Sequence, residues 1–191
     1  MTSNLPHIIY SESTPNPSVM KFVSNKILTS SSKECLSVTD SKGWPLLEKL
    51  FLFPFINEIF ISSNYISIKK IKDVEWEEVA NQVRSFIQTE LNNNTIICSK
   101  EEVEHQINNK PEKTQFAEEV ESVINKNIRP NIQMDGGDIE LFSVNNGVVK
   151  VFLKGACSGC PSSQMTLKNG IEFLLKKEFP NKINEVIAIN S

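Results

Sequence analysis

The chain has 191 residues, of which 39% are hydrophobic and 23% are charged, and its formal net charge at pH 7 is −3. This length suits one large or two small domains, and the composition is that of an ordinary globular protein. The charge, without any cluster of Lys and Arg interleaved with aromatic residues, gives no reason to expect a nucleic-acid partner.

The beginning of the chain and its most apolar stretch bear on its cellular location. Residues Met1 to Tyr10 contain neither a basic segment followed by an apolar core nor an Arg-rich amphipathic pattern, so no export or organelle-import segment is expected. Residues 46–61 are too polar and too short to span a bilayer. Four cysteines in such a chain are not typical of a disulfide framework. Together these features predict a cytoplasmic protein that does not bind membranes.

The N-terminal module is predicted over residues 8–95. Pro15 and Pro17 favour an extended or turning chain near its start. A short helix is expected from Trp44 to Leu52, and strands are expected at residues 19–23, 26–29, 59–62 and 65–71. Asp73 is predicted to cap a longer helix. The apolar residues of that helix recur at helical spacing and are Trp76, Val79, Val83, Phe86, Ile87 and Leu91. We expect a β-rich α/β domain without chemistry of its own.

A polar linker, residues 96–114, is predicted to lead into a C-terminal module at residues 115–190. The first helix of this module is expected to end at Arg129-Pro130, because the residue before a proline is pushed out of the helical region. Strands are expected at residues 139–144 and 148–154, with a tight turn between them at Asn146-Gly147. A second helix is expected from Pro161 onward, and a third strand at residues 183–189. The predicted order is helix, strand, strand, helix, strand.

The two modules together predict the fold class, an α+β or α/β protein of two small domains, each a small sheet packed with helices. The C-terminal module of about 75 residues has a marginal core, so we expect a dimer or a metal to help stabilise it. Its Asp135-Gly136-Gly137-Asp138 segment is read as a turn that starts the first strand, because glycine tolerates positive φ. Recognition of a partner by these acidic residues is the alternative, and the segment is not assigned as a site.

The chemistry of the chain is expected at Cys157-Ser158-Gly159-Cys160, between a strand and the helix that begins at Pro161. Unpaired N–H groups and the helix dipole favour negative charge there, so the thiolate form is expected to be stabilised, with Lys154 adding to the field. The remaining candidate ligands are dispersed along the chain and are predicted to be structural: Cys35, Cys98, His7 and His105.

Spacing alone leaves several kinds of site open. Half of a structural zinc ribbon is disfavoured, because no second cysteine pair or nearby histidine exists. A thiol–disulfide oxidoreductase using the Cys157/Cys160 dithiol fits the order of strand, Cys-x-x-Cys and helix. Two chains related by a two-fold axis would supply four thiolates to one 4Fe–4S cluster, which resolves the shortage of ligands.

Several segments resemble a known family. Arg129-Pro130, Asp135-Gly136-Gly137-Asp138 and the run from Lys154 to Ser163 resemble the NifU C-terminal domain family. In the N-terminal module, Thr14-Pro15-Asn16-Pro17 with Met20-Lys21-Phe22 is similar to the Nfu N-terminal domain.

The resemblance implies an iron–sulfur cluster scaffold or carrier that is not an enzyme. Cys157 and Cys160 match the family's ligand positions, so they are expected to bind iron in a labile 4Fe–4S cluster that bridges two subunits of a homodimer. Apo iron–sulfur proteins are the implied acceptors, and an upstream cluster-assembly scaffold is the implied donor. A separate cluster-assembly domain and a ferredoxin-like domain are not seen in the sequence, which favours a carrier acting downstream of assembly.

Overall fold

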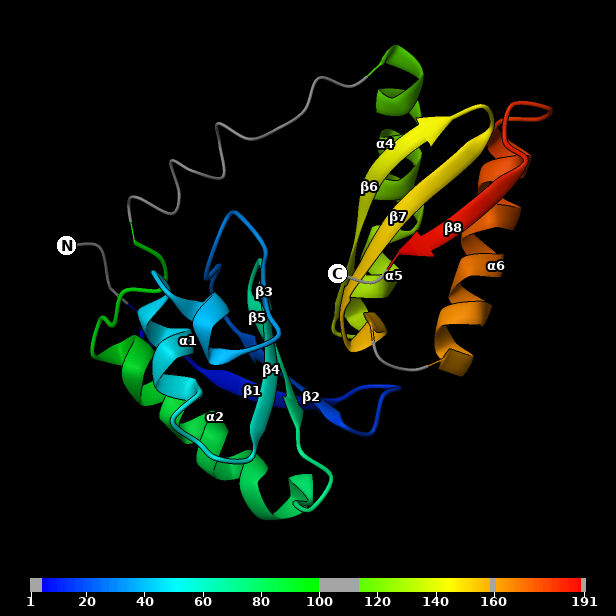
Figure 1. Cartoon of the computed structure of the whole chain (residues 1–191). Helices are drawn as coiled ribbons and strands as arrows, with labels where there is room; N and C mark the ends of the chain where they lie inside the picture. Colours follow the sequence, from blue (N-terminus) through cyan, green and yellow to red (C-terminus); the bar gives the residue numbers. More distant parts are fainter. Residues whose placement is uncertain (1–4, 100–113, 159–160, 190–191) are drawn as a thin grey trace. The chain divides into compact units, whose positions relative to one another are not determined.

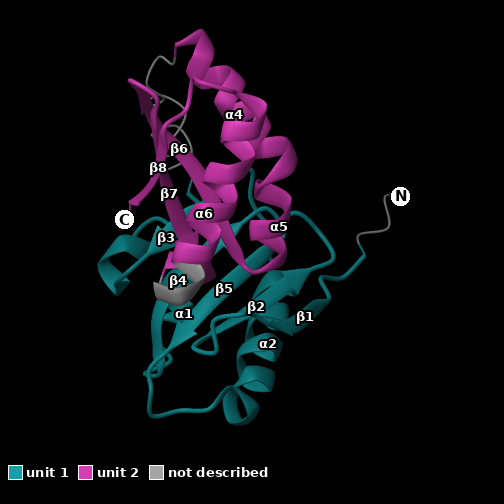
Figure 2. Cartoon of the chain, turned by 90° about the vertical axis from the view of Figure 1, so that its right-hand side faces the viewer, with its two compact units in different colours: residues 1–110 teal, residues 111–191 magenta. Residues whose placement is uncertain are grey.

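The computed structural model describes residues 5–99, 114–158 and 161–189, with the backbone alone for residues 161–164. The chain divides into two compact units, unit 1 (residues 1–110) and unit 2 (residues 111–191), which Figure 2 colours separately. Each unit packs a small sheet with helices (Figure 1), so the predicted fold class is confirmed. The bounds 8–95 and 115–190 stay predictions, and most of the predicted linker lies outside the described residues. Within the described ranges, no helix combines the length and apolar character needed to cross a membrane.

Unit 1 is a five-stranded antiparallel sheet covered by helices. Its strands lie in the order β1-β2-β5-β4-β3. The elements in chain order are β1 (Ile9–Ser13), β2 (Val19–Ser24), β3 (Lys33–Cys35), the 3₁₀-helix η1 (Val38–Ser41), α1 (Pro45–Leu50), β4 (Ile56–Ser62), β5 (Tyr65–Lys70) and α2 (Trp76–Asn92).

The core of unit 1 forms where the predicted helical stripe meets one face of the sheet. In α2, Trp76, Val83, Ile87 and Leu91 are buried, which confirms the predicted spacing. They join one hydrophobic cluster with alternate strand residues and with the apolar side chains of α1. Successive side chains of a strand point to opposite faces of the sheet. In the β4–β5 hairpin, the side chains that the sheet contributes to this cluster are Ile59, Ile61, Ile66 and Ile68.

Two predictions for unit 1 are wrong, and strands β1 and β3 were not predicted. Residues 26–29 form no strand, because the N–H groups of Leu28 and Thr29 both donate to the carbonyl of Ser63, at 2.8 and 3.1 Å. Strand β1 was not expected, since Ile9 is its single buried residue and an edge strand with so little to bury shows no alternation. Asp73 does not cap α2, because the helix begins at Trp76 with Glu75 at the N-cap position.

Unit 2 is a three-stranded sheet in the order β6-β7-β8, with its helices on one face of the sheet (Figure 2). Its elements are α4 (Gln115–Asn127), α5 (Arg129–Met134), β6 (Gly137–Asn145), β7 (Val148–Gly155), the 3₁₀-helix η2 (Ala156–Ser158), α6 (Pro161–Glu178) and β8 (Glu185–Ile189). Asn146 and Gly147 have φ values of 50° and 78°, as a tight hairpin turn between β6 and β7 requires. Strand β8 pairs with β7 in parallel, and α6 makes the crossover between them.

The first helix of unit 2 ends at Asn127, just before Arg129-Pro130, as predicted. A second helix that was not predicted, α5, begins at the dipeptide, because a proline in the first turn of a helix lacks only an N–H that would have no partner there. Helix α5 then adds Ile132 to the core of unit 2. It also carries the chain to the turn before β6, and this turn lies beside the predicted site.

Candidate metal centre at Cys157

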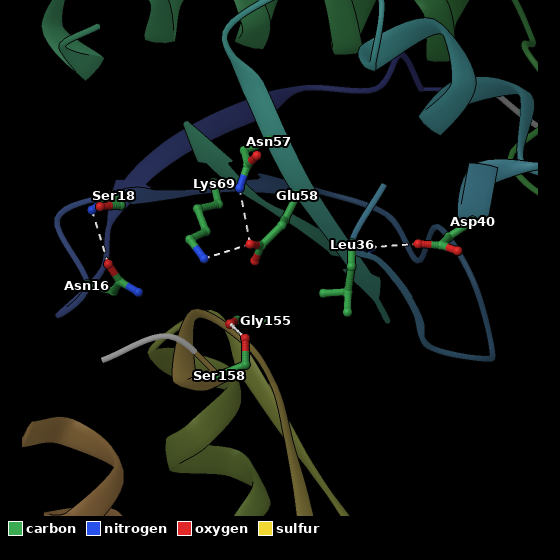
Figure 3. A network of polar contacts seen from close by, with 9 residues as sticks. All are labelled: Asn16, Ser18, Leu36, Asp40, Asn57, Glu58, Lys69, Gly155 and Ser158. Carbon is green, nitrogen blue, oxygen red and sulfur yellow. Dashed lines mark hydrogen bonds and ion pairs between the residues drawn. The ribbon is translucent and has the colours of Figure 1, made fainter. Parts of the chain in front are cut away.

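Cys157 lies in the 3₁₀-helix η2, directly after strand β7. The hydroxyl Oγ of Ser158 donates to the carbonyl of Gly155 at 2.8 Å, which closes this turn (Figure 3). The Cys157 side chain is half-buried and packs against the hydrophobic core of unit 2. Cys160 lies outside the described residues, so of the predicted pair the structure describes Cys157 and its neighbours.

The Asp135-Gly136-Gly137-Asp138 segment lies against the cysteine turn. The N–H of Ala156 donates to the carbonyl of Gly136 at 3.2 Å, and Gly137 pairs with Gly155 across β6 and β7. A Cβ atom at Gly137 would lie 2.6 Å from the Cys157 Sγ atom. The sequence predicts a turn at these four residues and does not predict their contact with Cys157. The two adjacent glycines are the one feature of the sequence that indicates a close approach of another segment.

An ion pair fixes the end of this segment. The Nε atom of Arg129 lies 3.0 Å from Oδ1 of Asp138, and Nη2 of Arg129 donates to the carbonyl of Ile139 at 2.6 Å. Asp138 is 8% exposed and also accepts from the N–H of Ile139 at 2.8 Å. Burial raises the pKa of the Asp138 carboxyl, and the charge of Arg129 opposes that shift. The pair therefore ties α5 to the first residues of β6.

The Cys157 thiol is harder to ionise than the sequence suggested. Burial raises its pKa from 9.0 to about 12, and the carboxylates of Asp135 and Asp138 add to the shift. The expected stabilisation of the thiolate is wrong for this residue, because burial and nearby negative charge oppose it. The ammonium of Lys154 pairs with Glu140 at 2.5 Å, and its charge acts to lower the pKa of Asp138, whereas the causes of the Cys157 shift are burial and the two carboxylates. A metal ion bound at Cys157 would therefore have to displace a proton.

The other predicted structural ligands lie in the packing of unit 1 or outside the described residues. Cys35 is fully buried in the core, and Cys98 packs against it and donates through Sγ to the carbonyl of Ser99 at 3.5 Å. The Nδ1 atom of His7 lies 3.2 Å from Oγ of Ser24, and burial lowers the pKa of the ring. His105 is not among the described residues. Within the described part of the chain, no three His, Cys, Asp or Glu residues are grouped to hold a metal ion.

Comparisons with known proteins identify both modules. A family model described as the NifU-like domain matches residues 120–187, and one described as scaffold protein Nfu/NifU N terminal matches residues 9–94. NifU-like protein C1709.19c of Schizosaccharomyces pombe is 34% identical over 95% of this chain and 73% of its own length. A solution structure of a NifU-like protein from Saccharomyces cerevisiae is 24% identical, with a TM-score of 0.44, and covers 52% of this chain and 91% of its own.

Two further relatives carry a location in their names. NifU-like protein 4, mitochondrial, of Arabidopsis thaliana is 30% identical over 87% of this chain and 61% of its own length. NFU1 iron-sulfur cluster scaffold homolog, mitochondrial, of Drosophila willistoni is 32% identical over 90% of this chain and 60% of its own length. Both relatives are named as mitochondrial, and this contradicts the cytoplasmic prediction. That prediction depended on the first ten residues, the apolar stretch at 46–61 and the cysteine content, and none of these decides the compartment. The chain spans about three fifths of the length of these two relatives.

The predicted resemblance is thus confirmed over most of the chain, in both modules. Relatives named as iron–sulfur cluster scaffolds support a role in iron–sulfur cluster assembly. The chain belongs to the Nfu family of NifU-like proteins.

Proposed function

We propose that the chain is a carrier that holds a labile 4Fe–4S cluster between two of its copies through Cys157 and Cys160, and that it delivers this cluster to apo-proteins. The observation that carries this function is the half-buried Cys157 thiol on the short turn after β7, inside the segment matched by the NifU-like domain. The cluster is the cargo of the reaction, and the protein supplies the sulfur ligands.

The ligand count supports sharing between two chains. A 4Fe–4S cluster is held by four cysteine thiolates. The described residues contain no group of three metal-binding side chains, and Cys35 is buried inside the core of unit 1. Two copies related by a two-fold axis would together present two Cys157 and two Cys160 side chains to one cluster.

The raised pKa of Cys157 supports a transferable cluster. At neutral pH its sulfur favours the protonated form, because the pKa is about 12, so a proton competes with iron for this ligand. During transfer, a thiol of the acceptor protein gives its proton to the Cys157 sulfur while the iron–Cys157 bond breaks and an iron–sulfur bond to the acceptor forms. No electron is gained or lost. Because no substrate is converted, we propose that the protein is not an enzyme.

The same pKa disfavours the thiol–disulfide oxidoreductase alternative. Cysteines that carry out thiol–disulfide exchange have lowered pKa values, which keep the attacking thiolate populated near neutral pH. Burial and two carboxylates shift Cys157 in the opposite direction. We therefore expect the protein to reduce disulfides slowly.

Anaerobic reconstitution with iron and sulfide tests the proposed function. The expected product is a dimer with one cluster per two chains, measured by iron and sulfide content and by light scattering. Cys157→Ala and Cys160→Ala should each lose the cluster, whereas Cys98→Ala should retain it as the matched control. One cluster per monomer without dimerisation, or a cluster retained by Cys157→Ala, would contradict the function. A disulfide-reduction assay on the metal-free chain distinguishes the carrier from the thiol–disulfide oxidoreductase. Rapid reduction of disulfides without any uptake of iron would support the oxidoreductase.

A further inference from the structure

We propose that Gly137 is a positioning residue for Cys157: its missing side chain leaves the space that the Cys157 sulfur occupies, and this contact sets the direction of the thiol. Gly137 acts on the cluster only through Cys157, so its importance for transfer rests on the proposed function. The contact itself belongs to the metal-free protein and can be measured there.

The close approach is defined by three distances. A Cβ atom at Gly137 would lie 2.6 Å from Sγ of Cys157, 3.1 Å from Cβ of Cys157 and 2.8 Å from the carbonyl oxygen of Lys154. Carbon atoms in van der Waals contact stand about 3.5–4.0 Å apart, so every side chain larger than hydrogen overlaps its neighbours here. With alanine at this position, the sulfur is the neighbour that can turn away, because it ends a side chain.

Backbone conformation does not explain the glycine. Gly136 has a φ of 81°, whereas Gly137 is absent from the residues with positive φ and lies within strand β6. A glycine inside a strand weakens it, since it has greater freedom to lose and no side chain to pack. The close approach of Cys157 supplies the reason for a glycine at this strand position.

Both sides of the contact are held, so neither can withdraw easily. On the Gly137 side, the neighbouring Asp138 is paired with Arg129, and Arg129 also bonds the carbonyl of Ile139. On the cysteine side, the N–H of Ala156 bonds the carbonyl of Gly136 and the hydroxyl of Ser158 bonds the carbonyl of Gly155. An added methyl group would therefore displace the thiol, while its close contact with the backbone carbonyl of Lys154 would remain.

A double-mutant cycle in the metal-free full chain tests the contact. The free energy of unfolding is measured in urea for the wild type, Gly137→Ala, Cys157→Ala and the double variant. Gly137→Ala should lower the folded-to-unfolded ratio both in the wild type and in Cys157→Ala. If Gly137 makes room for the sulfur, the reduction in the wild type should be roughly ten times the reduction in Cys157→Ala. Equal losses in both backgrounds would overturn the proposal, because the Lys154 carbonyl and the Cβ atom of residue 157, which are present in both, would then account for the whole effect.

The contact can still be tested if Gly137→Ala fails to fold. If Gly137→Ala does not fold, recovery of folding in the double variant supports the contact with sulfur, and failure of the double variant as well contradicts it. Gly170→Ala is the matched control, since a Cβ atom at Gly170 meets nothing within 4 Å and the residue lies in α6. This control should fold at least as stably as the wild type.

Reconstitution then connects the contact to the cluster. Gly137→Ala should bind less iron and show an altered absorption spectrum, whereas Gly170→Ala should match the wild type. A wild-type spectrum and iron content in Gly137→Ala would overturn the positioning role. If the wild type itself takes up no cluster, the proposed carrier function fails, and the cycle in the metal-free protein still decides whether Gly137 makes room for Cys157.

Discussion

The two units bury cysteine in opposite ways. In unit 1, Cys35 is fully buried in an apolar cluster beside α1 and α2, and it acts as a small hydrophobic side chain. In unit 2, Cys157 is half-buried at the rim of the core, where burial and then the nearby Asp135 and Asp138 raise its pKa. Both cysteines pack with a hydrophobic core, and the position of Cys157 at its rim beside two carboxylates distinguishes the candidate ligand from the packing residue.

The two units also differ in the polar groups that they bury. In unit 1 the indole Nε1–H groups of Trp44 and Trp76 are buried and have no hydrogen-bond partner among the described residues. Unit 2 instead buries the Asp138 carboxylate against Arg129, beside its predicted site. The large apolar side chains of unit 1 are expected to contribute most to its stability, and unit 2 is expected to depend on packing together with the Arg129–Asp138 ion pair.

The largest effect is expected from Trp44→Ala, which removes a fully buried side chain from the core of unit 1. The cavity should lower the free energy of unfolding of unit 1 by about 3–5 kcal/mol. Urea unfolding followed by the fluorescence of Trp76 measures this change, because the chain has two tryptophans and the other is replaced. Trp44→Phe should cost less, since it fills much of the space and breaks no hydrogen bond of the described structure. Equal losses for both variants would contradict the role of apolar packing.

In unit 2, Arg129→Ala should lower the free energy of unfolding by roughly 3 kcal/mol, because it leaves the Asp138 carboxylate buried without its partner. The NMR signals of the Val149 and Leu153 methyl groups, followed in urea, report on this unit. Lys176→Ala is the control, since its i,i+4 pair with Glu172 lies at the surface and is worth about 0.3–0.5 kcal/mol. The comparison of the units fails if the two variants lose the same stability.

A pH series sharpens the contrast between the two cysteines. The pKa of Cys157 is raised in the folded protein, so the unfolded chain loses this proton at lower pH than the folded chain does. Stability from this group is thus present below pH 9.0 and falls by about 1.4 kcal/mol per pH unit as the pH rises toward about 12. The difference in unfolding free energy between the wild type and Cys157→Ala, measured at several pH values, should show this slope. A flat difference would mean that the Cys157 thiol titrates normally.

Local patterns predicted much of the fold. The spacing of Trp76, Val83 and Ile87 was sufficient to predict α2, and Asn146-Gly147 was sufficient for the β6–β7 turn. Strand β1 could not be found in this way, because its residues other than Ile9 are exposed. Pairing with β2 decides its structure, and that pairing is a property of the folded sheet.

The candidate site was predictable in position but not in its properties. The order of strand, turn and helix places Cys157 correctly after β7. Its pKa depends on burial and on Asp135 and Asp138, which lie about twenty residues away in sequence and approach only in the folded unit. The same holds for Gly137, whose contact with the sulfur needs β6 and β7 to be paired.

The cysteine turn emerges from the central strand of its sheet. Residues 148–152 of β7 pair with β6 on one side and with β8 on the other. Amide hydrogen exchange there should require unfolding of the whole unit, because these strand residues are bonded on both sides. The turn at residues 156–158 is hydrogen-bonded to Gly136, directly before β6, and to Gly155 of β7, so a sulfur ligand on it is anchored to the most protected strand of the sheet.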